Sequence, residues 1–150
     1  MRAEQTIQSL EQLKVEAASL VAELTPLPDS ATLITLSGIL GAGKTAFTKA
    51  VAEELGLTDM VTSPTFVLEK IYALPAGSAF KKLIHIDAYR LGSGEEMAPL
   101  GFDEAMREPS NLILLEWPER VHEALPLPAI RIAIAALQDG SRRFSYEKIL

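Results

Sequence analysis

The chain has 150 residues, of which 48% are hydrophobic and 23% are charged, values ordinary for one soluble globular domain spanning residues 1–150. It contains no cysteine, which excludes disulfides and thiolate metal sites and leads us to expect a cytoplasmic protein. The net charge of −6 argues against direct binding of nucleic acid, and no apolar run approaches the ~20 residues that a membrane-spanning helix needs.

The first predicted element is an amphipathic helix over residues 9–24, because leucine and alanine recur there at three- and four-residue spacing. Ser9 and Gln12 offer a capping box at its start, and Pro26 and Pro28 follow its end. We expect this helix to cover one face of a sheet.

The segment Gly38–Thr45 reads G-x-x-x-x-G-K-T and lies between a predicted strand, residues 32–37, and a predicted helix that Gly56 closes. This order of elements is that of a P-loop. Its glycines let backbone N–H groups curl around phosphate oxygens, and the helix start adds free N–H groups and a positive dipole end. Lys44 adds a cation, and the Thr45 hydroxyl can bind Mg²⁺. The sequence therefore predicts a nucleoside triphosphate site.

Further strands follow this helix. A strand from Val61 to about Leu74, the turn Pro75–Ser78 and a strand over residues 82–89 predict a hairpin. Residues 111–116 are apolar apart from their ends, which is typical of a central parallel strand.

The remaining elements are a loop with short helical turns at 92–106, one short helix at 118–125, and a terminal hairpin of strands 130–137 and 144–149. Together the elements predict an α/β fold like that of P-loop NTPases, in three layers. Its mainly parallel central sheet would be flanked by helices and would end in the C-terminal β-hairpin.

Two acidic residues follow apolar strands, Asp87 in the middle of the chain and Glu116 later. The carboxyl edge of an open α/β sheet is where ligands bind, and Mg²⁺ usually takes one or two protein ligands beside phosphate oxygens and water. Both acids are therefore candidates to face the P-loop. The alternative for either one is a capping or surface role.

Two neighbours of these acids leave alternatives open. His85 lies on the same strand face as Asp87, where we favour a hydrogen-bonded core histidine over a general base. Trp117 follows Glu116 and could pack locally, stack on a base or contact a partner.

Four motifs together resemble the TsaE (YjeE) family, the bacterial ATPase of tRNA threonylcarbamoyladenosine biosynthesis. They are Gly38–Thr45, Ser63–Phe66, His85–Leu91 and Leu115–Pro118, in the family's order and spacing. The resemblance implies an ATPase that uses ATP and Mg²⁺ and works with homologues of the transferase TsaD and its scaffold TsaB. Such a chain would reach tRNA only indirectly, through that complex, and would need no membrane.

The resemblance also implies residue roles. Thr45 and Glu116 match the magnesium ligands, and Asp87 matches the acid needed for hydrolysis beside Lys44. Trp117 matches a functionally sensitive tryptophan. A switch-like loop near the γ-phosphate corresponds to Ser63, Pro64 and Thr65, and the ATP-binding positions correspond to Gly38, Gly41, Ala42, Gly43, Lys44, Thr45 and Ala46.

The chain departs from the family at Ile39, where a polar or acidic residue is usual, and at Ala46, where a threonine or serine is usual. Two other functions compete with the ATPase. A small-molecule P-loop kinase would need an arginine-bearing lid, yet the insert at 92–109 carries only Arg107. A nucleotide-gated binding module would recruit a partner in its bound state, with hydrolysis incidental.

Overall fold

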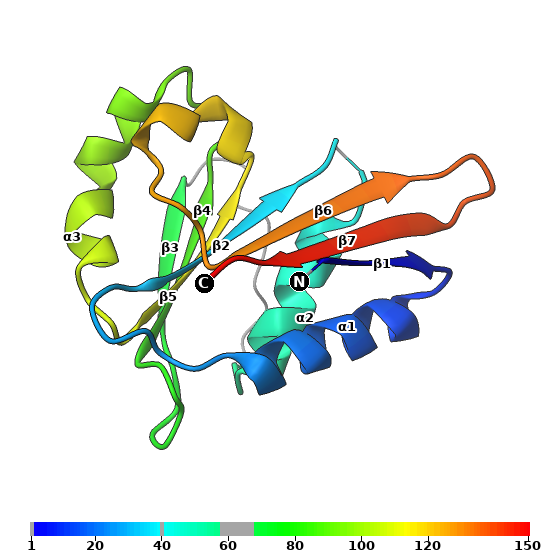
Figure 1. Ribbon diagram of the computed structural model, residues 1–150, viewed down its shortest axis with the longest axis horizontal. Helices are drawn as coiled ribbons and strands as arrows, with labels where there is room; N and C mark the ends of the chain where they lie inside the picture. The colour runs from blue at the N-terminus through cyan, green and yellow to red at the C-terminus, as the bar shows by residue number, and fades with distance from the viewer. Residues whose placement is uncertain (1, 40, 58–67) are drawn as a thin grey trace.

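The computed structural model describes residues 2–39, 41–57 and 68–150, and it contains one mixed sheet with helices on both faces (Figure 1). The order of the described strands across the sheet is β1-β7-β6-β2-β5-β4-β3. The strands are β1 (Arg2–Ile7), β2 (Thr32–Ser37), β3 (Glu69–Ala73), β4 (Lys82–Asp87), β5 (Asn111–Glu116), β6 (Ile130–Ala136) and β7 (Arg142–Lys148).

The helices separate into two groups, one on each face of the sheet. The α-helices are α1 (Leu10–Glu23), α2 (Lys44–Glu54) and α3 (Phe102–Met106), and the 3₁₀ helices are η1 (Gly94–Leu100), η2 (Pro118–Arg120) and η3 (His122–Ala124). Helices α1 and α2 pack beside each other on one face, and η1 and α3 lie on the other (Figure 1). No helix in the described ranges is long and apolar enough to cross a membrane.

Parallel pairing is confined to the middle of the sheet, in the strands β6, β2, β5 and β4. On the outside, β3 pairs antiparallel with β4, and β7 pairs antiparallel with both β6 and β1. The expectation of a mainly parallel sheet is therefore wrong, and the sheet is mixed. Short turns join β3 to β4 and β6 to β7, and such connections allow only antiparallel neighbours.

Side-chain alternation along the central strands divides the core in two. Ile34 and Leu36 of β2 pack with α1 and α2, whereas Leu33 of the same strand packs with η1 and α3. All six residues of β5 are buried, as expected for a strand covered on both faces. Both helical layers thus follow from apolar residues that point alternately to each face.

The local predictions are mostly confirmed. Helix α1 begins after Ser9, whose Oγ accepts from the Gln12 N–H at 3.2 Å, and both hairpins form. The prediction of one helix over residues 118–125 is wrong, because Val121, with φ −135°, separates η2 from η3. The predicted start of the strand from Val61, including Ser63, Pro64 and Thr65, lies outside the described residues.

Strand β1 is an element that the sequence analysis did not expect. Its six residues pair with β7 from Arg2↔Glu147 to Ile7↔Arg142. Among residues 3–7, whose side chains the structure describes, only Ile7 is buried. The strand therefore owes its conformation to pairing with β7 rather than to a hydrophobic pattern of its own.

Candidate functional site

The glycine-rich loop connects β2 to α2, and its glycines meet two different constraints. A Cβ added to Gly38 would lie 2.5 Å from the carbonyl oxygen of Ile134 in β6, so the loop passes too close to β6 for a side chain. Gly43, the residue before α2, has φ 114°, which disfavours any L-residue with a side chain. The loop therefore turns sharply against β6 and delivers Lys44 at the start of the helix.

Lys44 is buried, with 5% of its surface exposed, and its ammonium faces inward. The Nζ donates a short hydrogen bond to the Gly38 carbonyl and lies 3.6 Å from the centroid of the Trp117 ring. Burial lowers the pKa of Lys44, and the negative charges of Glu116, Asp87 and Glu119 oppose that shift. The cation thus lies inside the loop, among carboxylates.

Asp87 and Glu116 are neighbours across the parallel strands β4 and β5, and Glu116 is also in register with Leu36 of β2. Glu116 therefore lies beside the strand that leads into the glycine-rich loop, and Asp87 lies one strand further out. The sequence placed them at the same edge of the sheet, and the register brings them together on one face.

The surroundings of Asp87 raise its pKa. Burial is the largest cause, and the nearby carboxylate of Glu116 adds to it. The Tyr89 N–H, which donates to Oδ1 at 3.0 Å, lowers the pKa, as do the charges of His85 and Lys44. Asp87 is half-buried, so it remains accessible to a small ligand or to water.

Glu116 is held by His85. The Nε2 of His85 lies 2.6 Å from Oε2 of Glu116, and the two side chains are 1% and 5% exposed. A carboxylate only accepts hydrogen bonds, so Nε2 carries the proton in this contact. The Nδ1 of His85 is buried and has no hydrogen-bond partner among the described residues. This agrees with the favoured interpretation of His85 as a buried, hydrogen-bonded histidine.

The Trp117 side chain packs against Lys44 and Tyr89. It has φ 60°, the one positive φ of a non-glycine residue in the described ranges. Its N–H donates to the Leu36 carbonyl at 3.2 Å, and its ring lies 5.0 Å from that of Tyr89. With the backbone in this left-handed region, the indole lies across Lys44. The ring is partly exposed, so stacking on a base or a partner stays a prediction.

One contact of the loop was not expected from the sequence. Arg142, at the start of β7, donates from Nε to the Ala42 carbonyl at 2.9 Å and from Nη2 to the Gly41 carbonyl at 3.5 Å. No motif or spacing marks this arginine, because its partners lie 100 and 101 residues earlier in the chain. The signal available was a basic pair with Arg143, which is common on protein surfaces.

The positions where the chain departs from the family lie at two places around the loop. Ile39 is exposed at 66%, so an apolar side chain stands on the outside of the loop. Ala46 lies in the first turn of α2 and packs against the core beneath it.

Taken together, these contacts bring five predicted or neighbouring site residues to one place: Lys44, Asp87, Glu116, His85 and Trp117. Thr45 lies in the same helical turn as Lys44.

The donors at this edge fit Mg²⁺ better than a metal that needs a full protein cage. The buried carboxylate of Glu116 and the hydroxyl of Thr45 offer hard oxygen donors. No group of three or more acidic or histidine side chains among the described residues could hold a metal by itself. Mg²⁺ commonly takes one or two protein ligands and completes its shell with phosphate oxygens and water.

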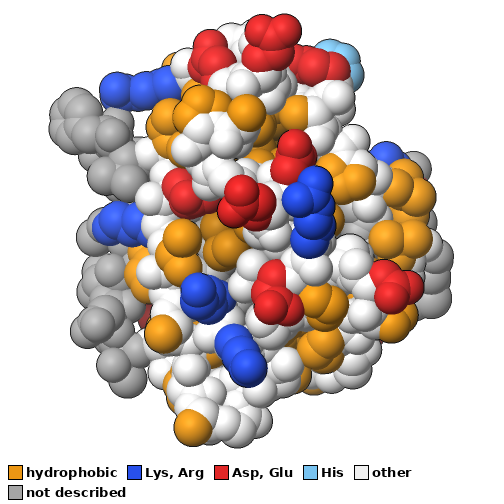
Figure 2. Space-filling view, turned by 90° about the vertical axis from the view of Figure 1, so that its left-hand side faces the viewer, with side chains coloured by type: hydrophobic (Ala, Val, Ile, Leu, Met, Phe, Trp, Pro, Cys, Tyr) orange, Lys and Arg blue, Asp and Glu red, His pale blue; other side chains and the backbone are white. Residues whose placement is uncertain are grey.

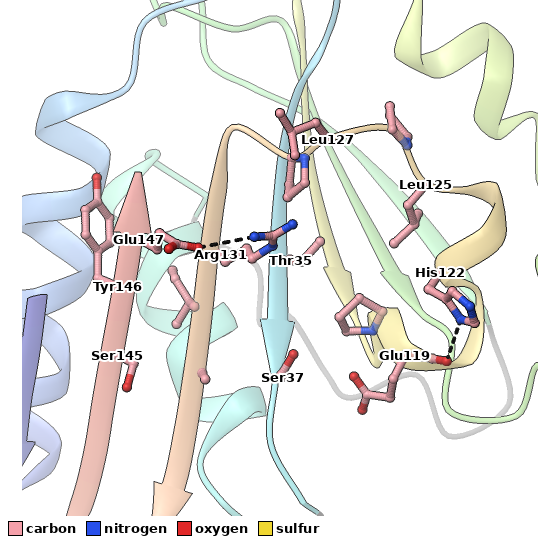
Figure 3. A pocket seen from close by; sticks show the side chains of 15 residues that line it. Thr35, Ser37, Glu119, His122, Leu125, Leu127, Arg131, Ser145, Tyr146 and Glu147 are labelled. Carbon is pink, nitrogen blue, oxygen red and sulfur yellow. Dashed lines mark hydrogen bonds and ion pairs between the residues drawn. The ribbon is translucent and has the colours of Figure 1, made fainter. Parts of the chain in front are cut away.

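A separate cavity of about 600 Å³ lies over β2, β6 and β7 (Figure 3). Thr35 and Arg131 line it, and they alternate along their strands with residues of the α1–α2 core, so the cavity opens on the opposite face of the sheet. An exposed ion pair between Arg131 and Glu147, at 3.2 Å, crosses it. None of Lys44, Asp87 and Glu116 lines this cavity, so its size does not mark it as the chemical site.

On the face that carries η1 and α3, acidic and basic side chains are interspersed (Figure 2). The described residues drawn there form no continuous basic patch. That face therefore lacks the concentration of cations that binding to a nucleic-acid backbone requires.

Comparison with known proteins gives a consistent result. A family model described as "Threonylcarbamoyl adenosine biosynthesis protein TsaE" matches residues 7–144. The tRNA threonylcarbamoyladenosine biosynthesis protein TsaE of Bacillus subtilis is 38% identical over 117 residues, covering 78% of this chain and 70% of the relative. That of Treponema pallidum is 35% identical over 119 residues, covering 79% and 84%. The crystal structure of Bacillus subtilis YdiB matches with a TM-score of 0.79 and 30% identity, over 100% of this chain and 87% of that one.

Proposed function

This chain belongs to the TsaE family, and we propose that it is a Mg²⁺-dependent ATPase with the P-loop fold that serves tRNA threonylcarbamoyladenosine biosynthesis. The observation that carries the proposal is the convergence of Lys44, Asp87 and Glu116 beside a glycine-rich loop at the carboxyl edge of one sheet. A cation, two carboxylates and a helix start are the parts that phosphoryl transfer to water needs.

In this proposal the loop from Gly38 to Thr45 cradles the phosphates of ATP. The α2 helix begins at Lys44 and directs the free N–H groups of its first turn toward them. Lys44 gives up the Gly38 carbonyl to meet the β- and γ-phosphates, because a phosphate is a stronger partner for its ammonium.

Thr45 and Glu116 would hold Mg²⁺, which supplies charge neutralisation at the phosphate oxygens when it is bound. His85 fixes the orientation of Glu116 through the 2.6 Å contact to Oε2. Asp87 is tied through Oδ1 to the Tyr89 N–H, so its other oxygen is the one that would orient the attacking water.

The partners in this proposal are homologues of TsaD and TsaB, and tRNA is reached only through them. Support comes from the net charge of −6 and from the interspersed charges of Figure 2, neither of which suits direct binding of tRNA. The proposal places this work in the cytoplasm, where tRNA is modified in bacteria.

The experiment that tests the nucleotide site is calorimetry of ATP binding with and without Mg²⁺, for the unmodified chain and for Lys44→Ala. Loss of a hydrogen bond to a charged group is worth about 1.5–3 kcal/mol, so the variant should bind roughly ten- to a hundredfold more weakly. Lys49→Ala, on the same helix, is the matched control.

Unchanged affinity of Lys44→Ala for ATP would contradict the assignment of the glycine-rich loop to the nucleotide site. Phosphate release in the same samples separates the competing functions. Nucleotide bound without phosphate release would favour a nucleotide-gated module, and release that depends on an added small-molecule acceptor would favour a kinase.

A further inference from the structure

The β6–β7 hairpin contacts the glycine-rich loop through hydrogen bonds from Arg142. The guanidinium donates hydrogen bonds from Nε to the Ala42 carbonyl at 2.9 Å and from Nη2 to the Gly41 carbonyl at 3.5 Å. Its Nη1 donates to the Gly140 carbonyl at 3.1 Å, in the turn that precedes β7. The Ser141 N–H donates to Asp139 Oδ1 at 3.0 Å and fixes that turn. The arginine is therefore positioned by its own hairpin before it reaches the loop.

We propose that Arg142 is a positioning residue that holds the peptide between Ala42 and Gly43 in the orientation that presents the Gly43 N–H to an anion. The inference rests on the proposed function, because it concerns the loop assigned there to the phosphates of ATP. It adds a contribution of the C-terminal hairpin to the phosphate site, 100 residues away from the loop in sequence.

Peptide geometry connects the contact to the anion site. The C=O and N–H of a trans peptide point in opposite directions, and the described residues contain no cis peptide. Because Arg142 donates to the Ala42 carbonyl, the N–H of Gly43, which belongs to the same peptide, points away from the arginine. Gly43 immediately precedes α2, so this N–H joins those of the first helical turn.

The loop's own hydrogen bonds join the Ala42 N–H to the Ile39 carbonyl at 3.1 Å and Lys44 Nζ to the Gly38 carbonyl, and neither involves the peptide between Ala42 and Gly43. Gly41 has φ 81°, and a Cβ added there would meet no heavy atom within 4 Å. A Cβ added to Gly43 would meet only hairpin atoms, Ile134 Cγ2 at 3.9 Å and Arg142 Nε at 4.0 Å. Glycine peptides can rotate at low cost, so a fork of two donors on consecutive carbonyls limits which orientations the loop populates.

The test compares Arg142→Ala, Arg142→Lys and the matched control Arg143→Ala, which removes a charge from the exposed neighbouring residue. The first readout is hydrogen exchange of the Ala42 amide, which donates to the Ile39 carbonyl at 3.1 Å, in the nucleotide-free chain. We expect faster exchange in both Arg142 variants and no change in Arg143→Ala. Thermal unfolding of each variant verifies that the chain remains folded.

The second readout is calorimetry with MgATP and with inorganic tripolyphosphate. We expect both Arg142 variants to bind both ligands about tenfold more weakly or worse, since lysine keeps the charge but cannot bridge two carbonyls. Normal binding by Arg142→Lys beside weak binding by Arg142→Ala would show that charge alone matters, and would overturn the inference. Loss for ATP but not for tripolyphosphate would place the arginine at the nucleoside and would also overturn it.

The two proposals fail in different ways. If the unmodified chain binds neither ligand, the proposed ATPase function is wrong, and the exchange measurement still decides whether Arg142 holds the loop. If the unmodified chain binds MgATP and the Arg142 variants match Arg143→Ala in exchange and affinity, only the positioning role is wrong.

Discussion

Asp87 and Glu116 occupy equivalent positions on adjacent strands, yet their surroundings differ. Glu116 is fully buried and held by His85, which suits a fixed metal ligand. Asp87 is half-buried and held through one oxygen, which suits a carboxylate that must also meet water. Placing two carboxylates together in a partly buried edge favours ligand binding over stability.

Asp87→Asn should therefore stabilise the chain while removing its turnover. Burial raises the Asp87 pKa, so the folded state binds this proton more tightly than the unfolded chain, and ionisation opposes folding. The opposition is absent below the ordinary value of 3.8 and grows as pH rises through the folded pKa. At pH 7 we expect a gain of at most about 1 kcal/mol, because solvent screens a half-buried charge.

Thermal unfolding at pH 7 and at pH 3 measures this effect, with Asp29→Asn, an exposed aspartate, as the control. The gain should be at most about 2–4 °C at pH 7 and should vanish at pH 3. MgATP binding should persist. A variant that still hydrolyses ATP at the original rate would contradict the role proposed for Asp87.

His85 provides the hydrogen-bond donor to the buried Glu116 carboxylate, and substitution of His85 tests how much this contact contributes to stability. His85→Leu leaves the buried Glu116 carboxylate without its donor, which should destabilise the chain by about 1–3 kcal/mol. His85→Gln retains an N–H donor and should recover part of that loss. Urea denaturation measures both, beside His122→Leu at an exposed histidine. Equal stability of His85→Leu and the unmodified chain would show that the contact is not needed.

At the scale of elements, the α1 helix depends on its cap. The Ser9 Oγ accepts from the Gln12 N–H at 3.2 Å, so Ser9→Ala should cost about 1 kcal/mol of stability. Ser19→Ala, at an exposed position inside the same helix, should be neutral or slightly stabilising. Denaturant midpoints of the two variants compare them directly, and equal midpoints would refute a role for the cap.

Elements set by local pattern could be predicted from the sequence, and those set by distant contacts could not. The α1 spacing, the glycine-rich loop and the apolar run of β5 each carry their own signal. Strand β1 forms only by pairing with β7, which lies at the other end of the chain. The break between η2 and η3 depends on a single residue, Val121, whose φ of −135° no spacing predicts.

The candidate site divides in the same way. Asp87 and Glu116 were found because apolar strands precede them, and the register of β4 and β5 then made them neighbours. The contacts of His85 with Glu116 and of Arg142 with Ala42 span 31 and 100 residues, and each depends on which strands lie side by side. A sequence identifies such residues only after the order of its strands is known.

On the scale of the whole molecule, the site combines many acids with few available cations. Lys44 is inside the loop, and the guanidinium of Arg142 is committed to two loop carbonyls. Arg120 lies 5.7 Å from the Trp117 ring and 5.5 Å from that of Tyr89, at the outer side of the aromatic pair. Phosphoryl transfer is accelerated when a further cation meets the developing charge, and partners often supply it.

We therefore expect slow phosphate release by the isolated chain and at least about tenfold faster release when homologues of TsaD and TsaB are added. Tyr89 is 37% exposed beside Trp117, so a partner that docks on this aromatic pair presses on the ring that contacts Lys44. Docking and the position of the phosphate-binding cation are thereby coupled through one side chain. The measurement is steady-state phosphate release at fixed ATP while the partner complex is titrated. Lys44→Ala in the same mixture shows whether this chain is the source of the phosphate.

Trp117→Ala is informative only if the basal and stimulated rates are measured separately, because the indole contacts Lys44 within the chain itself. The coupling predicts that this variant loses most of the stimulation at saturating partner, beyond any change in its basal rate. Stimulation that saturates at the unmodified level would place the docking surface elsewhere. Rapid turnover by the isolated chain, with no response to partners, would instead identify an independent ATPase or kinase.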